Sequence, residues 1–177
     1  MEGIKINIFI MNGCGAAGKT TFEKMIQEIA NAKGDKIEIL STIDYVKDVA
    51  KTFGWNGEKN IKDRKMLSDL KDLLTEWNDI PHKIICEKIK KCQETGVKAI
   101  FIDSREPKDI KRFVDEYQAL TVLIKRSNIA MIYGNHADDN VNDYEYDCVI
   151  DNSRGLLELF DEANIFYETF IKENEKE

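Results

Sequence analysis

Short apolar runs alternate with amphipathic segments along most of the 177-residue chain. Runs rich in β-branched and aromatic residues predict five strands, at 4–11, 36–40, 97–103, 119–125 and 146–150. Apolar residues at three- and four-residue spacing predict helices after residue 18 and over 41–54, 63–78, 81–96, 107–117 and 155–170. Strands that alternate with helices are typical of an α/β fold, in which crossover helices cover a parallel sheet.

The helix predicted over 63–78 carries an apolar stripe at helical spacing. We expect this stripe to lie in the core rather than to line a substrate pocket. Pro81 and Pro107 each fit the first turn of a helix, where the missing N–H costs nothing. The stripe consists of Met66, Leu67, Leu70, Leu73, Leu74 and Trp77.

The length suits one domain, here 1–177 as a whole. Hydrophobic residues make up 42% and charged residues 33%, a balance that supports a real core. Within the domain we expect the core at 1–41 and 97–172, a helical region at 42–96 and a lid-like loop at 127–145.

A net charge of −7 with no basic run argues against nucleic-acid polymers and anionic membranes as partners. No apolar run is long enough to span a bilayer, and no signal-peptide pattern is present, so we expect a cytoplasmic protein. The cysteines fit no zinc spacing and are expected to be reduced thiols. They are Cys14, Cys86, Cys92 and Cys148.

A glycine-rich turn separates the first strand from the first helix. Residues 13–20, "GCGAAGKT", match G-x-x-x-x-G-K-[ST]. The glycines let successive N–H groups point at phosphate oxygens, and the helix start adds its positive dipole end. Lys19 would reach the β- and γ-phosphates, and the Thr20 hydroxyl would bind Mg²⁺. The turn predicts a nucleotide-phosphate loop formed by Gly13, Cys14, Gly15, Ala16, Ala17, Gly18, Lys19 and Thr20.

A second polar group follows the strand predicted at 97–103. Asp103 stands at the carboxyl end of this strand, the edge where ligands bind in open α/β sheets. It could hold Mg²⁺ through water, and Arg105 could face a phosphate. The alternative is that Asp103 or Ser104 only caps the helix that begins at Pro107.

Phosphoryl transfer needs cations around the migrating group. Arg105 and Arg126 each follow a strand on the ligand-facing edge, so both are candidates. Arg64, near the start of the helix over 63–78, is a candidate for an acceptor phosphate. Each of these could equally be a plain surface charge. His136 lies in the predicted lid and could belong to a cover, although a lone loop histidine is more often just surface.

With these residues in place, the chain resembles nucleoside-monophosphate-kinase-type P-loop kinases. It is most similar to the group that joins bacteriophage-type deoxynucleoside monophosphate kinases and animal-type phosphomevalonate kinases. The likeness covers most of the chain. It rests on the glycine turn, on Ser41–Lys47, on "DSREPKDIKRF" (103–113) and on "HADDNVNDYEYDCVIDNSRGLLEL" (136–159).

The resemblance implies a three-layer P-loop NTPase fold with a five-stranded parallel sheet and a helical acceptor-binding insertion. It implies transfer of the γ-phosphoryl group of MgATP to a small phosphorylated acceptor by a monomer or homodimer. In this interpretation Arg64 and Arg105 hold the acceptor phosphate and the migrating group, and Lys47 lines the acceptor side. ATP would be held by residues 13–21, which include Thr21, with Arg126 near its phosphates and Asn152 and Gly155 bordering the adenine.

Two departures limit what the resemblance implies. After Arg126 the lid offers no further arginine until Arg154, and Ser41–Lys47 lacks the Gly-Pro of some relatives.

The first expectation is a (deoxy)nucleoside monophosphate as acceptor. The alternatives are a phosphomevalonate-like acceptor, a nucleotide-binding P-loop protein that transfers no phosphate, and a module that binds another anion. No N-K-x-D motif for guanine is present, which counts against a GTPase switch.

Overall fold

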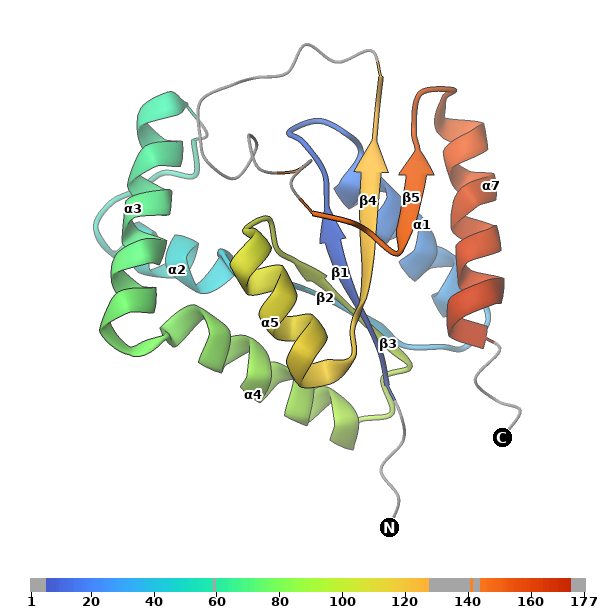
Figure 1. Cartoon of the computed structure of the whole chain (residues 1–177), viewed down its shortest axis with the longest axis horizontal. Helices are drawn as coiled ribbons and strands as arrows, with labels where there is room; N and C mark the ends of the chain where they lie inside the picture. The colour runs from blue at the N-terminus through green and yellow to red at the C-terminus, as the bar shows by residue number, and fades with distance from the viewer. Residues whose placement is uncertain (1–5, 59, 128–140, 142–143, 173–177) are drawn as a thin grey trace.

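The computed structural model describes residues 6–58, 60–127, 141 and 144–172. Five strands form one all-parallel sheet at its centre (Figure 1). Their order is β2-β3-β1-β4-β5, so the first strand lies in the middle. The α/β prediction with five parallel strands is confirmed. The strands are β1 (Asn7–Asn12), β2 (Ile37–Ser41), β3 (Ala99–Asp103), β4 (Leu120–Lys125) and β5 (Cys148–Asp151).

The helices follow the predicted segments closely. Pro81 lies in the first turn of α4, and Pro107 opens α5, as expected. The last predicted helix divides into α7 and a terminal π-helical turn, η2. The helices are α1 (Lys19–Ala32), α2 (Asp44–Thr52), α3 (Ile61–Asn78), α4 (Ile80–Glu94), α5 (Pro107–Tyr117), α7 (Leu156–Phe166) and η2 (Tyr167–Lys172).

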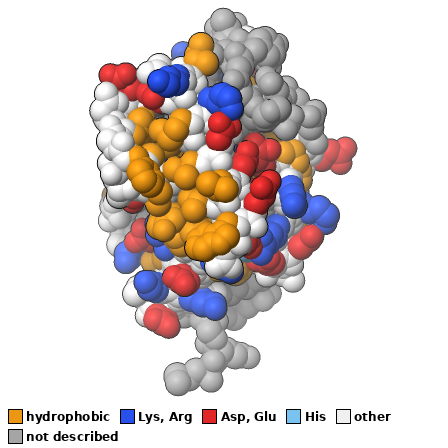
Figure 2. Space-filling view, turned by 90° about the vertical axis from the view of Figure 1, so that its left-hand side faces the viewer, with side chains coloured by type: hydrophobic (Ala, Val, Ile, Leu, Met, Phe, Trp, Pro, Cys, Tyr) orange, Lys and Arg blue, Asp and Glu red, His pale blue; other side chains and the backbone are white. Residues whose placement is uncertain are grey.

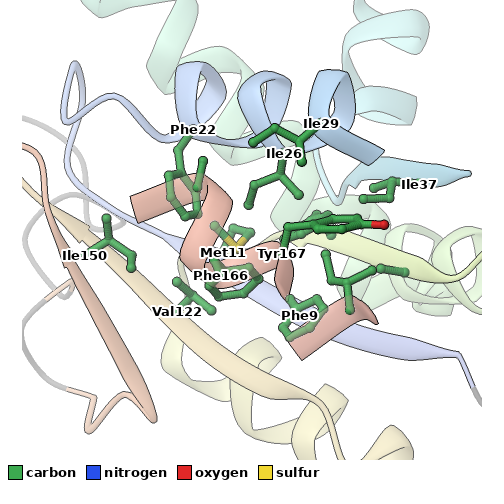
Figure 3. Packing of buried hydrophobic residues seen from close by; sticks show 14 of the residues in the cluster. Phe9, Met11, Phe22, Ile26, Ile29, Ile37, Val122, Ile150, Phe166 and Tyr167 are labelled. Atoms are coloured by element: carbon green, nitrogen blue, oxygen red, sulfur yellow. The ribbon is translucent and has the colours of Figure 1, made fainter. Parts of the chain in front are cut away.

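One face of the sheet is covered by α1, α7 and η2 (Figure 1). Its core is built on aromatic rings: Phe9 stacks on Phe101 at 5.1 Å between ring centroids and meets the edge of Phe166 at 5.0 Å. Phe22 of α1 packs against the same Phe166 ring (Figure 3). These contacts lock the helix that follows the glycine turn onto the sheet.

The opposite face is covered by α4 and α5. Alternation along β1 sends Ile8 and Ile10 to this side, where they pack with Ile89 of α4 and Phe113 of α5. The molecule is therefore a three-layer α/β/α structure, consistent with a P-loop-like fold. Within the described residues, no helix combines the length and the apolar character needed to cross a membrane.

The prediction that the apolar stripe of 63–78 lies in the core is wrong. α3 buries none of its residues, and Leu73 and Trp77 are 61% and 73% exposed. Figure 1 shows the reason, because α3 stands away from the sheet beside α2 and the start of α4. Figure 2 shows the consequence, a gathering of hydrophobic side chains on that side of the molecule. Helical spacing indicates which side of a helix is apolar but not whether another layer covers it.

The two aliphatic positions Ile89 and Leu73 give a matched test of this difference. Ile89 is fully buried in α4, so Ile89→Ala should lower the free energy of unfolding by about 2–5 kcal/mol. Leu73→Ala should change it by no more than about 0.5 kcal/mol, because little is lost at an exposed site. Urea unfolding measures both. Equal losses would mean that α3 is covered in solution.

Candidate active site

The glycine turn between β1 and α1 has a shape that its residues dictate. Gly18 is the N-cap residue of α1 with φ of 99°, and a Cβ there would lie 2.2 Å from Asn152 Nδ2. A Cβ on Gly13 would lie 2.8 Å from the carbonyl oxygen of Ile124. Neither position can hold a side chain without movement of the loop or its neighbours. The two motif glycines thus serve close packing of the turn against β4 and the residue after β5.

Two buried asparagines brace the turn. Asn152 donates from Nδ2 to the carbonyl oxygen of Ala17 at 2.8 Å. Asn12, fully buried, accepts from the Gly13 N–H at 2.7 Å and donates to the Tyr146 hydroxyl at 2.6 Å. Asn152 was expected beside adenine; the structure places its amide against the turn, at the cavity wall. Asn12 was missed, although an asparagine closing an apolar strand is a visible signal.

A cavity of about 660 Å³ opens at the carboxyl ends of the strands. Among the described residues, it is lined by every candidate site residue from the sequence except Gly13, which is buried. His136 and most of the predicted lid lie outside the described residues. The candidates brought together are Cys14, Gly15, Ala16, Ala17, Gly18, Lys19, Thr20, Thr21, Lys47, Arg64, Asp103, Arg105, Arg126, Asn152 and Gly155.

Lys19 and Asp103, which both line the cavity, form an ion pair. Their side chains are 11% and 22% exposed, so water screens the pair only in part. Asp103 does not cap α5, whose N-cap position is Glu106 without a side-chain cap. The interpretation of Asp103 or Ser104 as a mere cap is therefore wrong.

Glu23, one turn after Lys19 in α1, lies beneath this pair and is almost fully buried. Burial first, and then the Asp103 charge, raise the pKa of Glu23 to about 9, despite the opposing effect of Lys19. One of its oxygens, Oε1, has no hydrogen-bond partner among the described residues. Sequence reasoning missed Glu23 because its position in α1 reveals nothing of Asp103, 80 residues further on.

The side of the cavity away from the turn is built by α2 and α3. Lys71 of α3 pairs with Asp109 of α5 at 2.7 Å, and Lys47 of α2 pairs with Asp44 at 2.9 Å. Arg64 and Ser68 share the cavity-facing side of α3 with Lys71. Lys71 was missed at the sequence level, yet its spacing of seven from Arg64 was a signal that both face one way.

The charge of the cavity lining is opposite to that of the chain. Six cationic residues and three acids line it, a formal balance of +3 in a protein of net charge −7. Such a lining suits ligands that carry several negative charges. The cations are Lys19, Lys47, Arg64, Lys71, Arg105 and Arg126, and the acids are Asp72, Asp103 and Glu106.

Comparisons with known proteins place the fold alone. No family model matches the chain, and no curated protein does. Among solved structures, one described as "Crystal structure of APE1195" is similar over 94% of this chain and 97% of its own, with a TM-score of 0.52 and 16% identity. At that identity the likeness supports the three-layer α/β architecture and nothing about ligands.

The buried Glu23 makes stability depend on pH. The folded protein keeps a proton that the unfolded chain, with the ordinary pKa of 4.5, releases. This contribution is fully present below pH 4.5 and is lost as pH rises toward 9. In Mg²⁺-free buffer, the unfolding free energy of the wild type should therefore fall between pH 5 and 8, relative to Glu23→Gln, by on the order of 1 kcal/mol or more.

Urea titrations at several pH values measure this difference. Glu28→Gln, an exposed position of the same helix, is the matched control and should follow the wild type. Parallel curves for the wild type and Glu23→Gln would show that Glu23 is ionised in the folded protein.

Proposed function

We propose that the protein is an ATP-dependent phosphotransferase whose acceptor is itself a phosphorylated small molecule. One observation carries the proposal: a single cavity extends from the phosphate-type turn to α2 and α3 and has cations at both ends. A protein that only held a nucleotide would need the first group of cations alone. At about 660 Å³, the cavity is within the range of small-molecule sites.

The donor half fits ATP through the turn and its helix. Backbone N–H groups at the start of α1 and the Lys19 ammonium suit the phosphate chain. When ATP binds, the Lys19 ammonium would leave the Asp103 carboxylate and contact phosphate oxygens instead. Thr20 and Asp103 offer hydroxyl and carboxylate oxygens on the same cavity wall, the hard donors that Mg²⁺ prefers, and Mg²⁺ when bound would neutralise phosphate charge.

The acceptor half supports a phosphate on a larger organic body. Arg64, Lys71 and Arg105 are the cations that would hold and orient the acceptor phosphate. Trp55 and Leu67 add apolar surface, while Ser68 and Asp72 add polar groups. An indole ring and polar side chains that line one cavity suit a nucleobase, so a (deoxy)nucleoside monophosphate is the first candidate, and this agrees with the resemblance noted from the sequence.

Transfer would proceed by positioning and charge neutralisation, without a covalent intermediate on the protein. A phosphomevalonate-like acceptor is the alternative within the same class. It would use the same cations but would show no preference among bases.

A chromatographic product assay tests the proposal. The protein receives MgATP with each of the four dNMPs, dUMP, AMP, CMP or mevalonate 5-phosphate, and one reaction lacks acceptor. We expect a diphosphate product from one or two nucleotides. ADP formed equally without acceptor would indicate an ATPase or switch, and no turnover with any acceptor would contradict the proposal.

Lys19→Ala should abolish transfer and leave the protein folded. The lysine lines the cavity and pairs with Asp103, so its loss removes charge at the phosphates rather than an apolar core side chain. Lys24→Ala, an exposed lysine of the same helix, should retain activity. Product assays and circular dichroism on both variants check this. Unfolding of Lys19→Ala would mean that its ion pair with Asp103 is structural.

Arg105→Ala should lower kcat/KM for the acceptor at least about tenfold, which corresponds to about 1.4 kcal/mol at the transition state. The reason is the loss of one charged contact to a phosphate. Lys111→Ala removes an exposed cation of α5 that does not line the cavity, and is expected to have no effect. Initial rates over a range of acceptor concentrations measure both; equal kinetics would remove Arg105 from the site.

A further inference from the structure

Three potential metal ligands meet between α4 and α5, on the face of the sheet opposite α1. His82 and Cys86 are four residues apart on α4, so they share one side of that helix. Glu116 comes from α5. His82 Nε2 lies 2.8 Å from Glu116 Oε2 and 3.2 Å from Cys86 Sγ. One ligand atom from each residue lies within 4.8 Å of the other two.

Two of the three ligand atoms meet at a single ring nitrogen, although the Cys86 thiol also has Tyr117 as a hydrogen-bond partner. A ring nitrogen has either one proton or one lone pair, so Nε2 of His82 can serve one partner fully at a time. Glu116 and Cys86 both approach that same nitrogen. A cation between the three atoms would instead accept a lone pair from each of them.

Surrounding side chains contact two of the three ligands, Glu116 and His82. Arg112 donates from Nε to the other carboxylate oxygen of Glu116, Oε1, at 2.9 Å, which leaves Oε2 for the cluster. The Phe113 ring lies 4.8 Å from the His82 ring, centroid to centroid, and fixes its plane. The Arg112 charge is balanced in turn by Asp79, 2.6 Å away. Such outer contacts are typical of metal sites, where they set ligand orientation.

We propose that His82, Cys86 and Glu116 bind a divalent transition-metal ion, with Zn²⁺ as the best match. Imidazole, thiolate and carboxylate are the three ligand types that zinc uses. Tetrahedral ligands about 2.0–2.3 Å from a common ion lie about 3.6 Å from one another. The separations of 2.8 Å and 3.2 Å are shorter than this value and the third is at most 4.8 Å, so small side-chain rotations would bring the three atoms to tetrahedral spacing around an ion. Water would complete the fourth position.

The site would join the first turns of α4 to the last turn of α5. Because α5 begins four residues after Asp103, anchoring its far end would restrain the segment that carries Asp103 and Arg105. The inference does not depend on phosphotransfer. Cysteine spacing alone could not reveal it, since Cys86 is the single thiol in the group and Glu116 lies 30 residues further along the chain.

Metal titration of the full-length protein tests the proposal. Metal-free protein is mixed with Zn²⁺ in excess Mg²⁺, which competes for oxygen ligands at the cavity, and bound metal is counted after gel filtration. We expect one Zn²⁺ per chain and a higher melting temperature. Co²⁺ in place of Zn²⁺ should give a thiolate-to-metal charge-transfer absorption. No binding at micromolar Zn²⁺ would overturn the proposal.

Variants assign the site. His82→Ala, Cys86→Ser and Glu116→Gln should each weaken Zn²⁺ binding at least about tenfold, and Cys86→Ser should abolish the Co²⁺ thiolate absorption. Cys148→Ser, a half-buried thiol in β5, is the matched control and should bind as the wild type does. Cys86→Ser and Glu116→Gln preserve side-chain volume, and circular dichroism verifies their folding. Undiminished binding by all three variants would place the metal elsewhere and overturn the proposal.

Discussion

All five strands run in the same direction, and this constraint determines where chemistry can occur. Parallel strands bring their carboxyl ends to one edge of the sheet. One cavity is therefore lined by residues that span more than 100 positions: the turn after β1, Ser41 at the end of β2, Asp103 at the end of β3 and Arg126 after β4. The flanking layers of aromatic and aliphatic side chains keep that edge in place, since each face of the sheet is buried under its own set of helices.

Most of the fold and much of the cavity could be predicted from the sequence because they depend on local pattern. The strand runs, the prolines at helix starts and the eight-residue turn each carry their own signal. The exposure of the apolar side of α3 could not be predicted. Periodicity shows that a helix has an apolar side but not whether another element packs against it, and Leu73 and Trp77 are in fact exposed. Glu23 is buried, and Cys86 and Glu116 meet His82, only because α1, α4 and α5 pack against elements that are distant in the sequence. No local sequence pattern encodes those contacts.

In the glycine turn, the motif residues can be recognised from the sequence, but the motif does not reveal the residues that hold the turn in place. Gly18 and Lys19 belong to a pattern that can be searched for, whereas Asn12 and Asn152 hold the same turn from outside it. Asn152 illustrates the limit of reasoning from resemblance: it was expected to border adenine, and it does line the cavity, but its amide donates to the Ala17 carbonyl. Its contribution is to the shape of the turn.

The contrast between the cavity and the rest of the surface has a consequence for how anions arrive. Subtracting the +3 of the lining from the −7 of the chain leaves a formal −10 elsewhere. At low salt an approaching anion meets a repulsive field until it reaches the mouth of the cavity, whereas at 0.1 M salt the Debye length is about 10 Å and repulsion from more distant charges is largely screened. Moderate salt screens the long-range repulsion more than the short-range attraction. Physiological ionic strength would therefore favour the encounter between such ligands and the cavity, compared with low salt.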